Sequence, residues 1–344
     1  MRERRLPTAL AALTAAVVTS YPATATAADA TAAGTPGPVP SRPVCRFAGD
    51  RVIESSGLVD EGRLLLTVND SGDGPYVYAI DRRTGRLAGV TTYSSGDVTD
   101  VESMAPGQDG TVWVGDTGDN RESRDLIAVY HLPPVGRGDR TVDAKRFALQ
   151  YPDGAHNAEA ILLQPHSGRL FVVTKSVFGG TVYAAPRHLS TSRANRLSPF
   201  ARVSGLVTDA AFFPDGTHVL VRTYGTASVY TFPDFALVGT VRLPSQRQGE
   251  GVAIGADGEI LLSSEGVHAP VLSITLPASL TASTGSAKAG QSPVGPPPST
   301  RRPSPVAHPH PGGRSAADWG WIALVGVVLV ALGYGATRLS RFRH

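Results

Sequence analysis

The chain has 344 residues, a formal net charge of +3 and a single cysteine, Cys45. This length allows a large hydrophobic core, and one cysteine excludes an internal disulfide, so the folded part must depend on that core. The positive charge of the whole chain does not extend to the part predicted to fold, since residues 29–277 hold 22 Lys and Arg against 27 Asp and Glu, a net charge of −5. This acidic balance argues against a nucleic-acid partner, which needs a basic face, and favours cations.

The first residues have the order of a secretory signal. A basic start is followed by an apolar run over residues 6–18 and by small residues around Ala27. We therefore expect residues 1–28 to be a cleaved signal peptide, because the apolar run is too short for a membrane span. Residues 29–43 are rich in Ala, Thr, Pro and Gly and predict a disordered leader.

Residues 44–277 contain five related segments. Each begins with an acidic residue in a patch of small and apolar residues, at Glu54, Glu102, Glu159, Asp209 and Glu250. The spacings between these positions are 48, 57, 50 and 41 residues. The second strand of each segment is predicted over residues 62–68, 110–115, 168–174, 216–222 and 258–263, and the third over residues 76–80, 128–132, 181–185, 227–231 and 270–274. Fourth strands are predicted over residues 88–93, 146–151, 200–204 and 237–243.

A repeat of this length with four strands predicts an all-β fold, the β-propeller. The last segment lacks a fourth strand, and residues 44–48 can supply it and so close the ring. We predict five blades, with six as the alternative if the long second segment holds another. A β-sandwich is the rival class, but it needs no repeated acidic prefix.

The C-terminal part predicts a membrane anchor. Residues 278–318 form a Pro, Ser and Gly-rich stalk that cannot bury a core. Residues 319–337 contain no charge and are long enough for one transmembrane helix, and the basic residues 338–344 indicate a cytoplasmic tail. The sequence thus predicts a single-pass protein of the cell membrane whose N-terminal domain is displayed outside.

Carboxylates recur in the two kinds of loop that open on one face of a propeller. These loops precede each inner strand or follow each second strand. A hard cation with six to eight oxygen ligands would offset their repulsion, so we predict a calcium site from this set. The candidate metal ligands are Asn69, Asp70, Asp73, Glu102, Asp116, Asp119, Asn120, Glu159, Asp209, Glu250 and Glu265, and the wider acidic set includes Glu54 and Asp100.

Two observations refine this prediction. Residues 69–74 have oxygen side chains at alternate positions followed by Gly, like the first half of a calcium loop, although Ile80 stands where that loop needs Glu. Lys175, Arg222 and Tyr224 lie in the same loops and predict a site for a phosphate or carboxylate ligand. The alternatives are that the Asp and Asn residues form tight turns and that the basic residues pair with neighbouring carboxylates.

The repeated words DVESMA, GDTGDN, NAEAIL and QGEGVA resemble those of secreted bacterial propellers of the phytase and esterase-like-activity-of-phytase group, and of WD-repeat-like surface proteins of actinobacteria. The resemblance covers residues 54–277. It implies bound calcium, phosphomonoester hydrolysis by metal-activated water, and a cell surface of the actinobacterial type.

Two functions follow from these patterns. We expect a membrane-anchored binding module that holds calcium at an acidic face and takes a small-molecule, cell-wall or protein ligand, rather than an enzyme. The alternative is a calcium-dependent phosphoesterase, a metal-dependent phosphoric ester hydrolase. The few basic residues near the site disfavour that alternative for a polyphosphorylated substrate.

Overall fold

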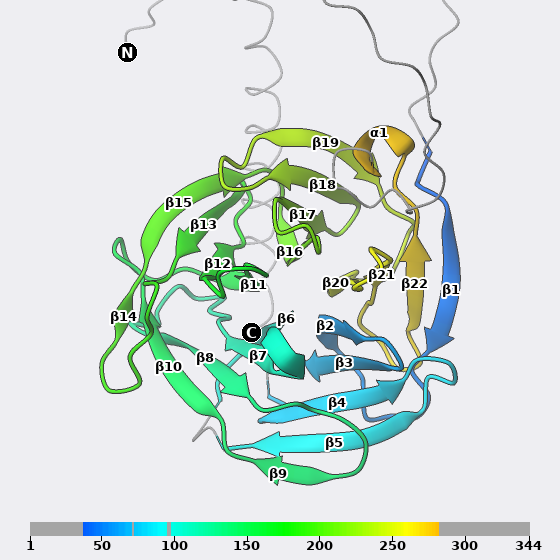
Figure 1. Ribbon diagram of the computed structural model, residues 1–344, viewed down its shortest axis with the longest axis horizontal. Coiled ribbons are helices and arrows are strands. Elements are labelled where there is room, and N and C mark those ends of the chain that lie inside the picture. Colours follow the sequence, from blue (N-terminus) through cyan, green and yellow to red (C-terminus); the bar gives the residue numbers. More distant parts are fainter. Residues whose placement is uncertain (1–36, 71, 95–97, 282–344) are drawn as a thin grey trace, which may run out of the picture. The chain divides into compact units, whose positions relative to one another are not determined.

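A computed structural model of the protein describes residues 37–70, 72–94 and 98–281. Five mainly antiparallel sheets stand around a central channel in these residues, and the first strand of each of the five repeated segments lies nearest the axis (Figure 1). The structure confirms the predicted five-bladed propeller. The predicted strands also match the observed ones to within a few residues, because short apolar runs bounded by turn residues mark most of them.

The first four blades follow one another along the chain. Blade 1 contains β2 (Ser55–Glu61), β3 (Leu64–Asn69), β4 (Tyr76–Asp81) and β5 (Leu87–Tyr93). Blade 2 contains β6 (Val101–Pro106), the 3-10 turn η1 (Gln108–Gly110), β7 (Val112–Asp116), β8 (Ile127–Leu132) and β10 (Lys145–Gln150). Blade 3 contains β11 (Ala158–Leu163), β12 (Leu170–Thr174), β13 (Gly180–Ala184) and β15 (Ser198–Val203). Blade 4 contains β16 (Val207–Phe212), β17 (His218–Thr223), β18 (Thr226–Thr231) and β19 (Leu237–Arg242).

Blade 5 closes the ring with strands from both ends of the domain. It contains β20 (Val252–Ile254), β21 (Ile260–Leu262) and β22 (Pro270–Ile274), and its outer strand is β1 (Ser41–Arg46). β1 pairs antiparallel with β22, as the missing fourth strand predicted. Cys45 lies on this strand as a free, half-buried thiol.

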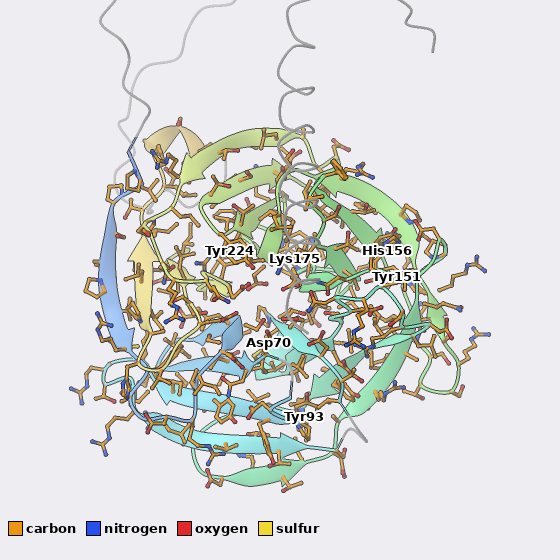
Figure 2. All side chains as sticks on the ribbon, turned by 180° about the vertical axis from the view of Figure 1, so that it is seen from behind. Asp70, Tyr93, Tyr151, His156, Lys175 and Tyr224 are labelled. Carbon is orange, nitrogen blue, oxygen red and sulfur yellow. The ribbon has the colours of Figure 1, made fainter. Side chains whose placement is uncertain are left out.

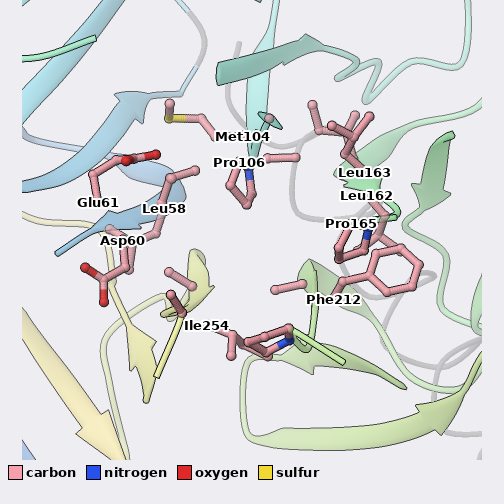
Figure 3. Close-up of a pocket in the computed structure, with 18 of the residues that line it drawn as sticks. Leu58, Asp60, Glu61, Met104, Pro106, Leu162, Leu163, Pro165, Phe212 and Ile254 are labelled. Atoms are coloured by element: carbon pink, nitrogen blue, oxygen red, sulfur yellow. The ribbon is translucent and has the colours of Figure 1, made fainter. Parts of the chain in front are cut away.

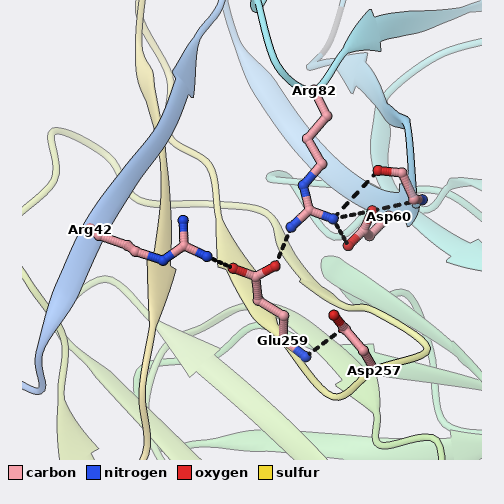
Figure 4. Close-up of polar contacts among 6 residues, drawn as sticks. Arg42, Asp60, Arg82, Asp257 and Glu259 are labelled. Carbon is pink, nitrogen blue, oxygen red and sulfur yellow. Dashed lines mark hydrogen bonds and ion pairs between the residues drawn. The ribbon is translucent and has the colours of Figure 1, made fainter.

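A polar network joins blade 5 to blade 1 where the ring closes (Figure 4). The carboxylate of Glu259 accepts hydrogen bonds from Arg42 on β1 and from Arg82 in the turn after β4. Arg82 also pairs with Asp60 on β2, with 2.9 Å between its Nη1 and Oδ2 of Asp60. The network therefore links the closing strand, the last blade and the first blade.

Hydrophobic side chains fill the spaces between neighbouring blades. Five clusters of buried residues occur in the described residues, one between each pair of adjacent blades. The inner part of each blade is thus buried on both faces of its sheet, and most of its second and third strands read as nearly continuous apolar runs, whereas outer strands such as β19 are more exposed. The inner strands line the channel, and loops at its two ends supply further side chains.

Two short edge strands were not predicted. β9 (Arg140–Val142) pairs parallel with β5 on the outside of blade 1, and β14 (Asn195–Arg196) pairs parallel with β10 on the outside of blade 2. Each belongs to the long connection that follows a strand of the next blade. The connection between β8 and β10, which contains β9, explains the 57-residue spacing of the second segment without a sixth blade.

The folded part extends beyond the predicted boundaries at both ends. Val39, placed by the sequence in the leader, is buried and donates its N–H to the carbonyl of Arg242. Residues 278–281, placed in the stalk, form the short helix α1 (Ala278–Thr281), whose Leu280 is buried against blades 4 and 5. Both corrections have one cause, the burial of a single apolar side chain that composition alone does not reveal.

The other predictions about the termini lie outside the described residues. They are the signal peptide 1–28, the rest of the leader and stalk, the transmembrane helix 319–337 and the tail 338–344. In the part of the chain that the structure describes, no helix is long and apolar enough to cross a membrane.

Candidate functional site

An irregularity near the start of four of the inner strands aims one side chain of each of these blades at the channel axis. The pairing of the inner strand with the second strand shifts at Ser55/Leu58, Val101/Ser103, Ala158/Ala160 and Val207/Asp209. A shift of this kind re-aims the residue it leaves unpaired. With the corresponding position of blade 5, the five residues are Ser56, Glu102, Glu159, Thr208 and Glu250, all at most 4% exposed.

A second ring of side chains follows the second strands on the same face of the disc, which we call the channel mouth. Asp70, Lys175 and Tyr224 each come directly after such a strand, and Figure 2 shows them around the centre of the ring. Nζ of Lys175 lies 3.1 Å from Oε1 of Glu159 and 5.5 Å from the centre of the Tyr224 ring. The predicted Lys175 and Tyr224 therefore lie at the channel mouth.

Three carboxylates converge beside this pair, and we call them the mouth cluster. One oxygen each from Asp70, Asp100 and Glu102 lies within 4.8 Å of the others. Oxygens bound to one Ca²⁺ at about 2.4 Å can be no more than about 4.8 Å apart, so this spacing fits a shared cation. Oδ1 of Asp100 is buried and has no hydrogen-bond partner among the described residues, which leaves it available as a ligand.

Ser56 positions one member of the mouth cluster. Its hydroxyl donates to Oε2 of Glu102 at 2.9 Å and also contacts the backbone carbonyl of Glu102 at 2.7 Å. The contact crosses from blade 1 to blade 2. It holds a buried carboxylate in one orientation before any cation arrives.

The carboxylates of the channel mouth are costly to ionise together. Burial, and then the charges of Asp70 and Glu159, raise the pKa of Asp100 to about 6. Burial and the charge of Glu159 raise the pKa of Glu102 well above its ordinary value. Burial raises the pKa of Glu250 to about 7, although Lys175 opposes this. A divalent cation bound here would offset the repulsion between these neighbouring carboxylates.

Lys175 stays protonated in this acidic surrounding. Burial lowers its pKa, but the charges of Glu159 and Glu250 raise it by more, so the net pKa is above the ordinary value. Burial and the charge of Glu250 likewise raise the pKa of Tyr224, which keeps its hydroxyl a donor. The mouth therefore combines fixed carboxylates with one ammonium and one phenol.

The predicted half of a calcium loop forms a hydrogen-bonded turn outside the mouth cluster. Oδ1 of Asn69 accepts the backbone N–H groups of Ile53 and Glu54 at 3.0 and 3.1 Å. Oδ2 of Asp73 accepts the Tyr78 hydroxyl at 2.7 Å. Only Asp70 of this loop joins the mouth cluster, and the turn alternative accounts for Asn69 and Asp73.

The side-chain oxygens of the segment after β7 also have hydrogen-bond or ion-pair partners within the protein. Asp116 pairs with Arg124 at 2.9 Å and accepts the backbone N–H of Asp100 at 3.0 Å. Oδ2 of Asp119 accepts the backbone N–H groups of Ser123 and Arg124, each at 2.7 Å. Oδ1 of Asn120 accepts a bond from Asn157 at 3.1 Å. Asp116 therefore holds the backbone of Asp100 in place, whereas Asp119 and Asn120 fix the loop after β7.

Asp209 and Arg222 lie between blades 4 and 5 rather than at the mouth. Asp209 accepts the backbone N–H groups of Ala210 at 2.8 Å and Val252 at 2.6 Å. Arg222 is 1% exposed and donates to the carbonyl of Ser263 and to the amide oxygen of Gln246, both at 2.8 Å. Asp209 stands one position after the irregularity, so it points away from the axis, and the predicted ligand role of Arg222 is corrected to a structural one.

The remaining predicted carboxylates lie at the edge of the site. The backbones of Glu54 and Glu265 form a bridge, and Oε2 of Glu265 accepts a bond from Gln248 at 2.6 Å. The sequence did not single out Asn157, which donates to Oε1 of Glu159 at 2.9 Å. Its place in the repeat, two residues before Glu159, matches that of Asp100 before Glu102, and this alignment is the signal that could have found it.

Comparisons with known proteins give only distant likenesses. No family model matches the chain, and no curated protein matches it. Among solved structures, a gluconolactonase of Xanthomonas campestris is similar at 15% identity and a TM-score of 0.41, covering 64% of this chain and 70% of that one. Two structures of glucose dehydrogenase are similar at 12% identity, with TM-scores of 0.41 and 0.44, covering 69% of this chain and all of theirs. The resemblance to phytase-type propellers stays a prediction, and the function proposed below rests on the side chains at the channel mouth.

Proposed function

We propose that the protein is a binding module that holds a divalent cation, Ca²⁺ by the chemistry of its ligands, at the channel mouth and presents it to an oxygen-rich ligand. The observation that carries the proposal is the convergence of Asp70, Asp100 and Glu102 within 4.8 Å. All three offer hard carboxylate oxygens, which suit Ca²⁺. Three protein ligands leave coordination positions for oxygens of a ligand.

The neighbours of the mouth cluster favour an anionic or hydroxyl-rich ligand. Lys175 and Tyr224 stand close to each other and supply an ammonium and a phenol at the mouth. A bound cation and a lysine together attract a carboxylate or phosphate group. The pairing of Lys175 with Glu159 fixes the ammonium in position, so it needs little ordering on binding.

Apolar side chains surround this polar centre. Of the seven large hydrophobic side chains that are exposed in the described residues, six lie on loops of the mouth face and the seventh, Leu237, lies elsewhere. The six are Ile53, Leu126, Val177, Phe178, Tyr224 and Val267. Phe178 is 91% exposed. Exposed apolar residues gathered around a polar centre are typical of an interaction surface, which supports binding over catalysis.

Display at the cell surface is part of this proposal. Its support is in the sequence, where residues 1–28 resemble a secretory signal and residues 319–337 an anchor. An outside location suits a calcium-dependent module, since extracellular modules bind Ca²⁺ at millimolar levels. The ligand would then be a small molecule, a cell-wall component or a protein.

One observation favours hydrolysis as a second candidate function. Glu250 is 4% exposed, and its Oε2 has no hydrogen-bond partner among the described residues. Burial raises its pKa to about 7, close to the value of an effective general base for cation-activated water. Turnover of p-nitrophenyl phosphate that needs Ca²⁺ and is lost in Glu250→Gln would replace the binding proposal with this one.

Calorimetric titration of CaCl₂ into the chelator-treated full-length chain tests the binding proposal. We expect one Ca²⁺ per chain, and an affinity at least about tenfold weaker in Glu102→Gln, which removes one charged ligand. Glu122→Gln is the matched control, because Glu122 is exposed and outside the mouth cluster. Absence of binding to the unaltered chain, or equal binding by Glu102→Gln, would refute the proposed site.

A further inference from the structure

The end of the channel opposite the mouth holds a cavity of about 560 Å³. The last residues of all five inner strands line it, namely Glu61, Pro106, Leu163, Phe212 and Ile254. Figure 3 shows the side chains of Leu58, Met104, Leu162 and Phe212 around it. This volume lies within the range of about 300–1,000 Å³ that is typical of small-molecule sites.

The walls of this cavity are mostly apolar. Leu58, Met104 and Ile161 come from the inner strands of three different blades. Pro106, Pro214 and Ala256 are lining residues that are exposed, so the cavity opens to solvent. A hydrocarbon group that enters it would leave water, which is favourable by about 25 cal/mol for each Å² buried.

Every charged side chain among the lining residues is a carboxylate, from Asp60, Glu61 and Asp109. Asp60 is already paired with Arg82 at 2.9 Å. Glu61 forms no hydrogen bond or ion pair in the described part of the chain, and Figure 3 shows it on the same side of the cavity as Leu58 and Asp60. Burial and the neighbouring charge of Asp60 raise the pKa of Glu61, so a cation near it would relieve a cost that is already present.

We propose that this cavity is a binding site for a small amphipathic organic cation, with its hydrocarbon part against the apolar walls and its ammonium group beside Glu61. An anionic ligand of the same shape would face three carboxylates and no basic lining residue. A neutral ligand would gain the apolar contact but no ion pair. The site is independent of the cation site at the mouth, because the two share no residue.

Displacement of the neutral dye Nile red from the full-length chain tests this proposal with three probes of one chain length. The probes are n-octylammonium, 1-octanol and octanoate. We expect n-octylammonium to compete at least about tenfold more strongly than octanoate, with octanol between them. The lining carboxylates attract the ammonium group and repel the carboxylate group of octanoate.

Two variants assign the displacement to this cavity. Glu61→Gln should weaken n-octylammonium by about threefold and leave octanol unchanged, as expected for one half-exposed ion pair. Ala256→Trp adds a large ring at the exposed rim and should weaken all three probes at least about tenfold by filling space. Ala194→Trp, at an exposed alanine outside the lining, and Glu122→Gln are the matched controls and should match the unaltered chain.

Three outcomes would overturn the proposal. Octanoate competing as well as n-octylammonium would show an apolar site without charge selection. Equal competition in Ala256→Trp and Ala194→Trp would place the binding elsewhere on the chain. A preference for n-octylammonium over octanol that is as large in Glu61→Gln as in the unaltered chain would contradict the assigned ion pair with Glu61.

Discussion

The carboxylates of the mouth cluster and those of the surrounding turns occur in similar sequence motifs. They differ in whether the fold supplies them with hydrogen-bond or ion-pair partners. Asp116, Asp119 and Asp209 are satisfied by an arginine or by backbone N–H groups. Asp100 and Glu102 instead face other carboxylates, and one oxygen of Asp100 has no partner among the described residues. An acidic residue whose oxygens already have partners in the fold is structural, whereas one held against other carboxylates is a candidate cation ligand.

Asp209→Ala should have the largest effect, on stability alone. It leaves the buried N–H groups of Ala210 and Val252 without acceptors, which costs about 2–5 kcal/mol of unfolding free energy in total. Urea unfolding measures the loss, and Asp125→Ala, at an exposed carboxylate, is the control. A loss below about 1 kcal/mol would mean that Asp209 does not hold blades 4 and 5 together.

Asp100→Asn should have the reverse pattern. Its Oδ1 bonds to nothing among the described residues, so the cation-free protein should keep its unfolding free energy or gain slightly from reduced repulsion. Calcium affinity should fall at least about tenfold, because a charged ligand is lost. Calorimetry and urea unfolding together separate the two effects. A large loss of stability with unchanged calcium binding would show that Asp100 is a structural residue and not a cation ligand.

Calcium binding should weaken as the pH falls. The pKa of Asp100 is raised to about 6 and that of Glu102 is also raised, so protons compete with the cation and lower the affinity by at least about fourfold between pH 7.5 and 5.5. A raised carboxyl pKa stabilises the cation-free fold at low pH, and that contribution is lost as the pH rises through about 6 and 7. The difference in melting temperature with and without Ca²⁺ should therefore widen from pH 5.5 to 7.5. A constant difference would contradict the proton competition.

Lys175→Met should have the smallest effect, a calcium affinity about threefold tighter. The substitution removes a positive charge close to the site and frees Glu159 from its ion pair. Calorimetric titration would detect the change, with Lys145→Met, at an exposed lysine of β10, as the control. Weaker calcium binding in Lys175→Met would show that Lys175 supports the cation site rather than opposing it.

Most of the fold could be predicted from the sequence because it repeats. Five copies of one strand pattern indicated the blade number, and the absent fourth strand indicated closure by the N-terminal strand, which is β1 (Ser41–Arg46). β9 and β14 could not be predicted, since they have three and two residues and take their order from the edge strands beside them. Burial of Val39 and Leu280 likewise depends on surfaces far away in sequence.

The candidate site was predicted in part. Lys175 and Tyr224 were placed correctly because they follow second strands directly, whereas Arg222 precedes the turn and points between blades. Asp209 was aligned with Glu102 and Glu159, but it lies one position later relative to the irregularity that aims those residues at the axis. A one-residue shift reverses the direction of a strand side chain, and spacing alone does not reveal it.

Thermal unfolding of the full-length chain after chelator treatment, with and without added Ca²⁺, tests the central claim most directly. Saturation at about one hundred times the dissociation constant adds about 2.7 kcal/mol, which should raise the melting temperature by about 5 °C or more. An unchanged melting temperature, together with no metal in the purified protein, would contradict the account of the channel mouth as a cation site.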